Sequence, residues 1–185
     1  MSTQNIVIIV LLAGAGLLWG WLNLHPDDSQ TNTSSQSPDF TASELYTVSY
    51  DKLGNVQYRV YADSMKYYEK SQTSSFESPR ILIYPGPQRP IWQIVSRTAN
   101  AYKQNLVTFH KDVVIKNLSN DGYIQDLLTS LLHVNLTEQT MSTDQKVTVV
   151  GPQYDQIGIG MHGSLATEVV TLHRDINAVY HNEQN

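Results

Sequence analysis

The parts of this chain best suited to chemistry are a glycine-rich hexapeptide and six histidines. Gly158 to Gly163 reads GIGMHG, which matches the GxGxxG pattern of dinucleotide-binding sites. That pattern works only where a strand leads into a helix inside a βαβ unit, with an acidic residue about 20 positions further on. Here it lies among short alternating runs. We therefore expect these glycines to allow bends or close strand contacts.

No other segment carries a catalytic or metal-binding pattern. The histidines are scattered, without HxH, HExxH or a neighbouring carboxylate group, at His25, His110, His133, His162, His173 and His181. The chain has no Cys, which excludes thiolate zinc sites, iron–sulfur clusters, disulfides and cysteine nucleophiles. It also lacks a GxSxG elbow and a P-loop. We predict no catalytic residue, no metal and no cofactor, and the protein is not expected to be an enzyme; a hydrolase site assembled only in space is an alternative.

The overall charge argues against nucleic-acid binding. Lys and Arg number 12 and Asp and Glu 17, which gives a formal net charge of -5 and an isoelectric point near 5.6. A nucleic-acid partner requires a basic surface that displaces counterions from phosphate. No nucleic-acid partner is therefore expected.

An uncharged apolar run near the N-terminus predicts a membrane anchor. Residues 6–24 read IVIIVLLAGAGLLWGWLNL, and a helix of that length spans about 28 Å, close to a hydrocarbon core of about 30 Å. Trp19 and Trp21 lie near its end, where amphipathic rings favour the headgroup level. A cleaved signal peptide is the alternative. The run lacks a basic start and a small-residue cleavage site, so an uncleaved anchor is favoured.

Around the anchor we predict four parts: a short head at 1–5, a transmembrane segment at 6–24, a flexible linker at 25–42 and a folded domain at 43–185. The linker is rich in Ser, Thr, Gln and Asn, which bury too little apolar surface to offset chain entropy. All Lys and Arg lie from Lys52 onward, so charge gives no orientation signal. Topology alone, a short head before a long domain, predicts that the domain is translocated.

Beyond the linker, short alternating apolar runs start every 8 to 12 residues or so, with turn residues between them. Asp51 to Asn55 is one such turn. Helical periodicity is suggested only over Arg174 to His181. The pattern predicts an all-β domain of antiparallel strands in a sandwich or jelly-roll arrangement. Several runs, such as Tyr58 to Tyr61 and Tyr67 with Tyr68, place large side chains on both faces. An open apolar interior, paired edges or a thick core would each explain them.

The order of several segments after the anchor and tether carries a family resemblance. These segments read RVYADSMKYY at 59–68, FESPRI at 76–81, PIWQI at 90–94, ANAY at 99–102, VTVVG at 147–151 and GIGMHG at 158–163. The ordered set resembles the LptC family, the bitopic inner-membrane component of the bacterial lipopolysaccharide export bridge. It covers the chain from the anchor to about Tyr180. The head lacks the basic residues of the family, and His110 to Asp112 replace a turn that often contains Gly.

The resemblance implies an all-β fold, an incompletely closed twisted β-jelly roll (OstA-like) in the periplasm, tethered by one N-terminal transmembrane helix to the cell inner membrane. The implied function is lipopolysaccharide transport from the inner to the outer membrane. The implied partners are lipopolysaccharide itself, the inner-membrane ABC transporter subunits LptF and LptG with the ATPase LptB, and the soluble periplasmic protein LptA. Lipid acyl chains would pass along an apolar groove, and the proteins would dock by edge-strand addition.

Two sets of residues are candidates for these roles. Strand periodicity within pairs such as Ile81 and Ile83 places one set on the inner face, where they would line the groove. Ordinary core packing is the alternative for each of them, and a one-residue error in register would invert each choice. The predicted groove residues are Leu45, Phe76, Ile81, Ile83, Trp92, Ile94, Phe109, Val149, Met161 and Tyr180. The predicted partner-binding edges contain Leu45, Val48, Tyr50, Gly151, Val170, Leu172 and Tyr180.

A different class of protein is also compatible with the sequence. Glycosylation sequons begin at Asn32, Asn117 and Asn135. Taken literally, they indicate a structural or adhesive type II membrane glycoprotein with a sealed β-sandwich. Such triplets arise by chance in a chain rich in Asn, Ser and Thr. The two hypotheses differ in whether the interior of the domain is open.

Overall fold

The structure is a computed structural model that describes residues 37–86, 91–103, 105–119 and 123–181. The predicted head, the anchor and most of the linker lie outside the described residues. Within the described part, no helix is long and apolar enough to cross a membrane. The secondary structure there is all-β, as the alternating runs predicted.

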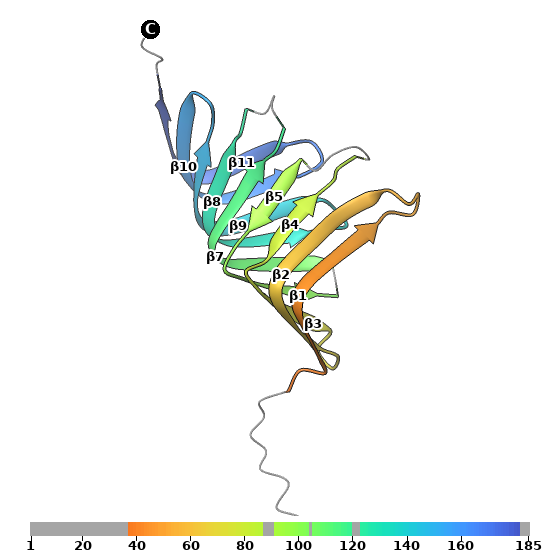
Figure 1. The fold of residues 1–185 in the computed structure, drawn as a ribbon. Helices are drawn as coiled ribbons and strands as arrows, with labels where there is room; N and C mark the ends of the chain where they lie inside the picture. The colour runs from red at the N-terminus through yellow and green to blue at the C-terminus, as the bar shows by residue number, and fades with distance from the viewer. Residues whose placement is uncertain (1–36, 87–90, 104, 120–122, 182–185) are drawn as a thin grey trace, which may run out of the picture. The chain divides into compact units, whose positions relative to one another are not determined.

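Antiparallel strands account for this domain (Figure 1). The described residues form β1 (Phe40–Tyr50), β2 (Val56–Tyr68), β3 (Thr73–Glu77), β4 (Arg80–Ile83), β5 (Trp92–Val95), β6 (Thr98–Tyr102), β7 (Leu106–Asn117), β8 (Asp126–Asn135), β9 (Thr140–Val150), β10 (Tyr154–Ser164) and β11 (Val169–Tyr180). The first strand begins slightly before the predicted domain start at Ser43. The segment with suggested helical periodicity, Arg174 to His181, belongs to β11 up to Tyr180, where pairing with β10 outweighs local pattern.

The long strands pass through two layers, because each pairs with different neighbours along its length. Residues 58–61 of β2 pair with β4, whereas residues 64–68 pair with β3. In the same way, residues 106–110 of β7 pair with β6 and residues 114–117 pair with β5. We call the layer that contains β4 and β5 sheet I, and the layer that contains β3 and β6 sheet II. Figure 1 shows the long strands curving between the two layers.

Bulges with positive φ angles mark these bends. Lys111 and Asp112 have φ angles of 63° and 51°, and the β7–β8 register shifts at that point. Gly160 has a φ of 76° beside a register shift between β9 and β10, and Asp175 has a φ of 51° in β11. Because a bulge bends a strand and increases its twist, these residues turn the strands from sheet I into sheet II. GIGMHG is therefore a strand with a bend, as predicted, and His110 to Asp112 form a bulge inside a continuous strand.

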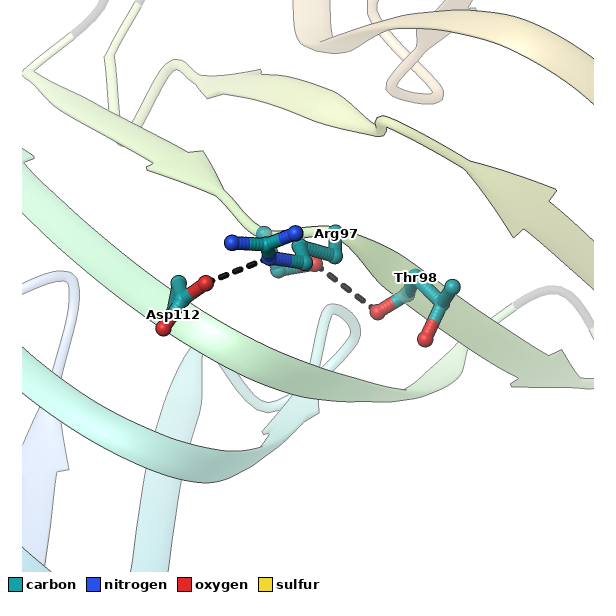
Figure 2. Close-up of polar contacts among 4 residues, drawn as sticks. Arg97, Thr98 and Asp112 are labelled. Atoms are coloured by element: carbon teal, nitrogen blue, oxygen red, sulfur yellow. Dashed lines mark hydrogen bonds and ion pairs between the residues drawn. The ribbon is translucent and has the colours of Figure 1, made fainter.

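A polar corner links β5 to β6 beside the β7 bulge (Figure 2). The backbone nitrogen of Arg97 donates to the Lys111 carbonyl at 3.1 Å, and the Arg97 guanidinium pairs with Asp112. Nearby, Ser96 Oγ donates to the Thr98 carbonyl at 2.8 Å. Both charged side chains are largely exposed, so their ion pair contributes little stability. The geometry of the corner therefore depends on the β7 bulge and on the backbone hydrogen bond between Arg97 and Lys111.

The turn between β1 and β2 was also predicted from its sequence. Asp51 Oδ1 accepts hydrogen bonds from the backbone nitrogens of Leu53 and Asn55, each at 2.8 Å. The Asn55 side chain donates to Asp51 Oδ2 at 3.1 Å, and this bond above all lowers the pKa of Asp51. Gly54 has a φ of 85°, a conformation that glycine adopts without a side-chain clash.

Large apolar side chains fill the space between the two layers over most of the domain. The largest fully buried ones are Trp92, Phe109, Ile94, Ile115, Leu127, Leu132, Met141, Met161, Leu165, Val113 and Val147. They come from both layers and form one cluster. This part of the interior is therefore a thick core, one of the alternatives that the large side chains on both strand faces left open.

Candidate functional site

An uncharged cleft opens between the layers on the β1 side of the domain. Its volume is about 580 Å³. The wall consists of Phe40, Leu45, Thr47, Val48, Ser49, Tyr58, Val60, Met65, Tyr67, Ser74, Phe76, Pro79, Ile81, Ala99, Ala101, Val107 and Leu136. None of these side chains is charged, and most are apolar. An alkyl chain could therefore enter without displacing water from an ionised group.

Three of the predicted groove residues line this cleft. Leu45 comes from the edge strand β1, Phe76 from β3 in sheet II, and Ile81 from β4 in sheet I. They are brought together because the β2 bend carries β3 and β4 into different layers that face each other. Leu45 and Phe76 are half-buried, whereas Ile81 is 4% exposed.

Six further predicted groove residues lie in the closed core. They are Ile83, Trp92, Ile94, Phe109, Val149 and Met161, and none is more than 3% exposed. Strand periodicity assigned them to the inner face, where they are. It could not tell whether the opposite layer is in contact there. Core packing, the alternative considered for each, describes these six side chains, and contact with a ligand would require the layers to separate.

The remaining predicted groove residue, Tyr180, is 73% exposed at the end of β11. Its ring lies 6.4 Å from the ring of Tyr154, centroid to centroid. This side chain is not enclosed, because within the described ranges β11 pairs on one side only, with β10.

Several cleft residues were not predicted, notably Met65 and Tyr67 of β2. Tyr58 and Val60 face the cleft from even positions, but after the bend the odd positions Met65 and Tyr67 do so. Tyr61 points to the other face, where its ring stacks on Tyr46 at 4.9 Å. The large side chains on both faces of this run reflect the contact between Tyr61 and Tyr46 on the outer face, and they did not reveal the parity change at the bend.

The first and last strands, which contain all of the predicted edge residues except Gly151, are the edges of the sheet. Strand β1 pairs with β2 alone, and β11 pairs with β10 alone, among the described residues. Natural edge strands are usually protected by charges or proline. Residues 45–50 of β1 read LYTVSY and residues 176–180 of β11 read INAVY, with neither. Both edges are thus suited to pairing with another strand.

The predicted edge residues divide by position. Leu45, Val48 and Tyr50 lie in β1, and Tyr50 is 60% exposed. In β11, Val170 and Leu172 pack against the core, whereas Ile176, Val179 and Tyr180 are all more than half exposed.

Gly151, predicted at an edge, is in fact interior. It is buried in the connection between β9 and β10, two strands with neighbours on both sides. Its backbone nitrogen donates to the Tyr154 carbonyl at 2.7 Å, and a Cβ at this position would lie 2.5 Å from the Tyr154 ring. Gly151 therefore has a structural role in this connection.

Within the described ranges, no group of three His, Asp or Glu side chains gathers as a metal site would require. His133 Nδ1 lies 3.0 Å from Thr108 Oγ1 on the outer face of sheet II, and His181 pairs with Asp155. These histidines have local hydrogen-bond partners and lie outside the cleft.

Two layers joined by bent strands, with an apolar cleft between them and a free strand at each end, define an open β-jelly roll. A crystal structure with a similar fold is that of LptH from Pseudomonas aeruginosa, described as the LptA homologous periplasmic component of a lipopolysaccharide transport device. The TM-score is 0.53 at 11% identity, over 68% of this chain and 95% of that one. At this identity the likeness concerns the fold alone.

Sequence comparison then identifies the family. Residues 6–181 match the family described as "Lipopolysaccharide-assembly, LptC-related", and the chain belongs to it. The lipopolysaccharide export system protein LptC of Haemophilus influenzae is 23% identical over 199 residues, and that of Escherichia coli is 22% identical over 182 residues. Both alignments cover 97% of this chain and 95% of the relative. The resemblance drawn from ordered segments is confirmed.

Proposed function

We propose that this protein is a lipopolysaccharide relay of the cell inner membrane. It receives the lipid from the ATP-driven transporter, LptF and LptG with LptB, and passes it to soluble LptA. A single N-terminal helix, residues 6–24, holds the domain at the periplasmic face. Family membership supports the transport role, and the export system named for the relatives supports a place in the cell envelope.

The observation that carries this proposal is the uncharged cleft beside an unprotected edge strand. Residues of β1 both line the cleft and form the sheet edge. A strand added to β1 by a partner would therefore extend the cleft wall across the interface. Burying an acyl chain contributes about 0.8 kcal/mol per CH₂, so a continuous apolar path keeps the lipid out of water during transfer.

The two edges have different proposed partners. The N-terminal edge, β1, meets the periplasmic domain of the transporter, and the C-terminal edge, β11, meets the soluble jelly-roll partner. This assignment follows the family resemblance. It agrees with the absence of charge and proline from residues 45–50 and 176–180, which leaves backbone N–H and C=O groups on both edges available.

In-cell photo-crosslinking tests the cleft. A photo-reactive amino acid at Phe76 is expected to capture lipopolysaccharide, because that side chain faces the cleft. The same amino acid at Glu77, one residue along β3 on the exposed face, is the matched control, and Lys146 in the exposed part of β9 is a second. We expect at least tenfold more lipid adduct at Phe76, measured on immunoblots with antibody against lipopolysaccharide.

Equal labelling at Phe76 and Glu77 would contradict the proposal and favour a tethered scaffold with a sealed core. Leu45 provides an independent cleft position on another strand. Trp92 is unsuitable, since it is fully buried and its replacement would disturb the core.

A further inference from the structure

The two layers also meet on the side opposite their bends. The long strands are bent near their middles, so the hairpin turns of sheet I and sheet II lie at the free ends of the layers. A lipid with acyl chains inside the domain and sugars outside it must pass between these free ends. Any contact between the two sets of ends therefore closes the route of the polar head.

One turn makes such a contact. Residues 165–168 join β10 to β11 at the free end of sheet II. Trp92 Nε1, in β5 of sheet I, donates a buried hydrogen bond to the Leu165 carbonyl at 2.9 Å. Asn117 Nδ2, at the end of β7 in sheet I, donates to Glu168 Oε2 at 3.0 Å. Leu165 itself is fully buried, so its side chain plugs the interior at this point.

The size of the cleft indicates that this closed arrangement cannot hold a whole lipid with many chains. A volume of about 580 Å³ is within the range of pockets that hold one small ligand, roughly 300–1,000 Å³. The interior beyond it is filled by core side chains. More room would have to come from separation of the layers, and the contacts of residues 165–168 oppose it.

Two features of this turn favour its release from sheet I. Its attachment to sheet I includes two polar contacts, whose donors and acceptors water can satisfy after release, and the buried Leu165 side chain, whose exposure is the main cost of opening. Glu168 has a φ of 57°, a conformation that costs energy for a residue other than glycine. Within sheet II the turn stays anchored, because the Leu165 nitrogen donates to the Gln139 carbonyl at 2.8 Å.

We propose that residues 165–168 form a latch that closes the slit between the two layers. It must release from Trp92 and Asn117 before lipid in the cleft can reach the β11 edge. This inference rests on the proposed function and adds a step of control to it. In the latched state the cleft accepts an acyl chain from the β1 side only.

The absence of native cysteine makes a covalent test specific. The double variant Asn117→Cys with Glu168→Cys, in the full chain in cells, is joined by a short bifunctional thiol reagent. The photo-reactive amino acid is placed at Phe76, in the cleft, or at Tyr180, on β11. Bridging is expected to leave lipopolysaccharide capture at Phe76 intact and to lower capture at Tyr180 at least tenfold. The same variant treated with a monofunctional thiol reagent is the control.

The outcomes separate the latch from the transport role. Capture at Tyr180 that is unchanged by bridging overturns the latch while leaving the relay in place. Loss of capture at Phe76 in every form, including the unbridged one, overturns the relay and with it the latch.

A second measurement does not depend on transport. Trp92→Phe keeps a large ring but removes the N–H, so the Leu165 carbonyl loses its buried partner. The thiol of Leu165→Cys, which is buried while the turn is attached to sheet I, should react with a thiol reagent about tenfold faster in the Trp92→Phe background of the purified full chain, while that of Val134→Cys in the core changes less. Equal acceleration at both thiols would mean general destabilisation and no separate latch.

Discussion

Replacing Gly151 by leucine is expected to destabilise the domain by about 3 kcal/mol, near the upper end of the usual cost of overpacking. A Cβ on Gly151 would lie 2.5 and 2.7 Å from two atoms of the Tyr154 ring and 2.9 Å from the Tyr123 carbonyl oxygen. The ring cannot swing away freely, because Tyr154 Oη donates to that same carbonyl at 3.0 Å. Accommodating the side chain requires the start of β10 to shift.

Thermal unfolding of the purified chain measures this effect. For a domain of this size, about 3 kcal/mol corresponds to a fall in Tm of about 10 °C. Gly86→Leu is the matched control, since a Cβ there meets no atom of the described residues within 4 Å, and it should change Tm by about 1 °C or less. A Tm for Gly151→Leu equal to that of the Gly86 control would show that the connection between β9 and β10 yields easily.

A double-mutant cycle locates the cause. If the Tyr154 ring is the main obstacle, Gly151→Ala should cost less in a Tyr154→Ala background than in the native chain, because the two nearest atoms are gone. Strict additivity would instead assign the cost to the Tyr123 carbonyl or to the backbone of Gly151.

Ala178→Pro is expected to weaken binding of the soluble partner at least tenfold while leaving the fold intact. The nitrogen of His181 donates to the Gln153 carbonyl at 2.8 Å, and the register pairs Val179 with Asp155. Paired and unpaired positions alternate in antiparallel strands, so the N–H of Ala178 points away from β10 toward the free edge. Proline removes that donor, and its ring obstructs the approach of the partner strand. Together, the lost intermolecular hydrogen bond and the obstruction cost about 1.4 kcal/mol or more of binding free energy.

Val179→Pro is the contrasting variant, because the same alternation directs its N–H toward β10. It should fray the end of β11 and lower Tm, whereas Ala178→Pro should not. Binding to purified soluble partner is measured by titration calorimetry, and co-purification with the membrane transporter is measured in parallel. Ala178→Pro that binds the soluble partner normally but loses the transporter would reverse the assignment of the two edges.

Much of the fold could be predicted from short-range patterns. Alternation of apolar residues identified β1, β2, β4, β5 and β7 to β10, but not the short strands β3 and β6, and turn residues such as those at 51–55 marked strand ends. The first and last strands were expected at the edges, which the pairing confirms. At Arg174 to His181 the local pattern was ambiguous, and pairing with β10 decided it. Gly151 was predicted at an edge of the sheet, but it follows a strand in the interior of the sheet. The sequence marks where a strand ends, and it does not show which strands lie beside it.

What the sequence determined by itself was the type of each element and the face that each side chain occupies, because both depend on neighbours a few residues away. Phe76 and Trp92 were assigned to the inner face on that basis, and both lie there. Only the tertiary structure decided that one borders an open cleft and the other is sealed against Leu165, which lies 73 positions along the chain. The separation of two layers depends on bends, bulges and contacts between distant strands, and no local period of a sequence records it.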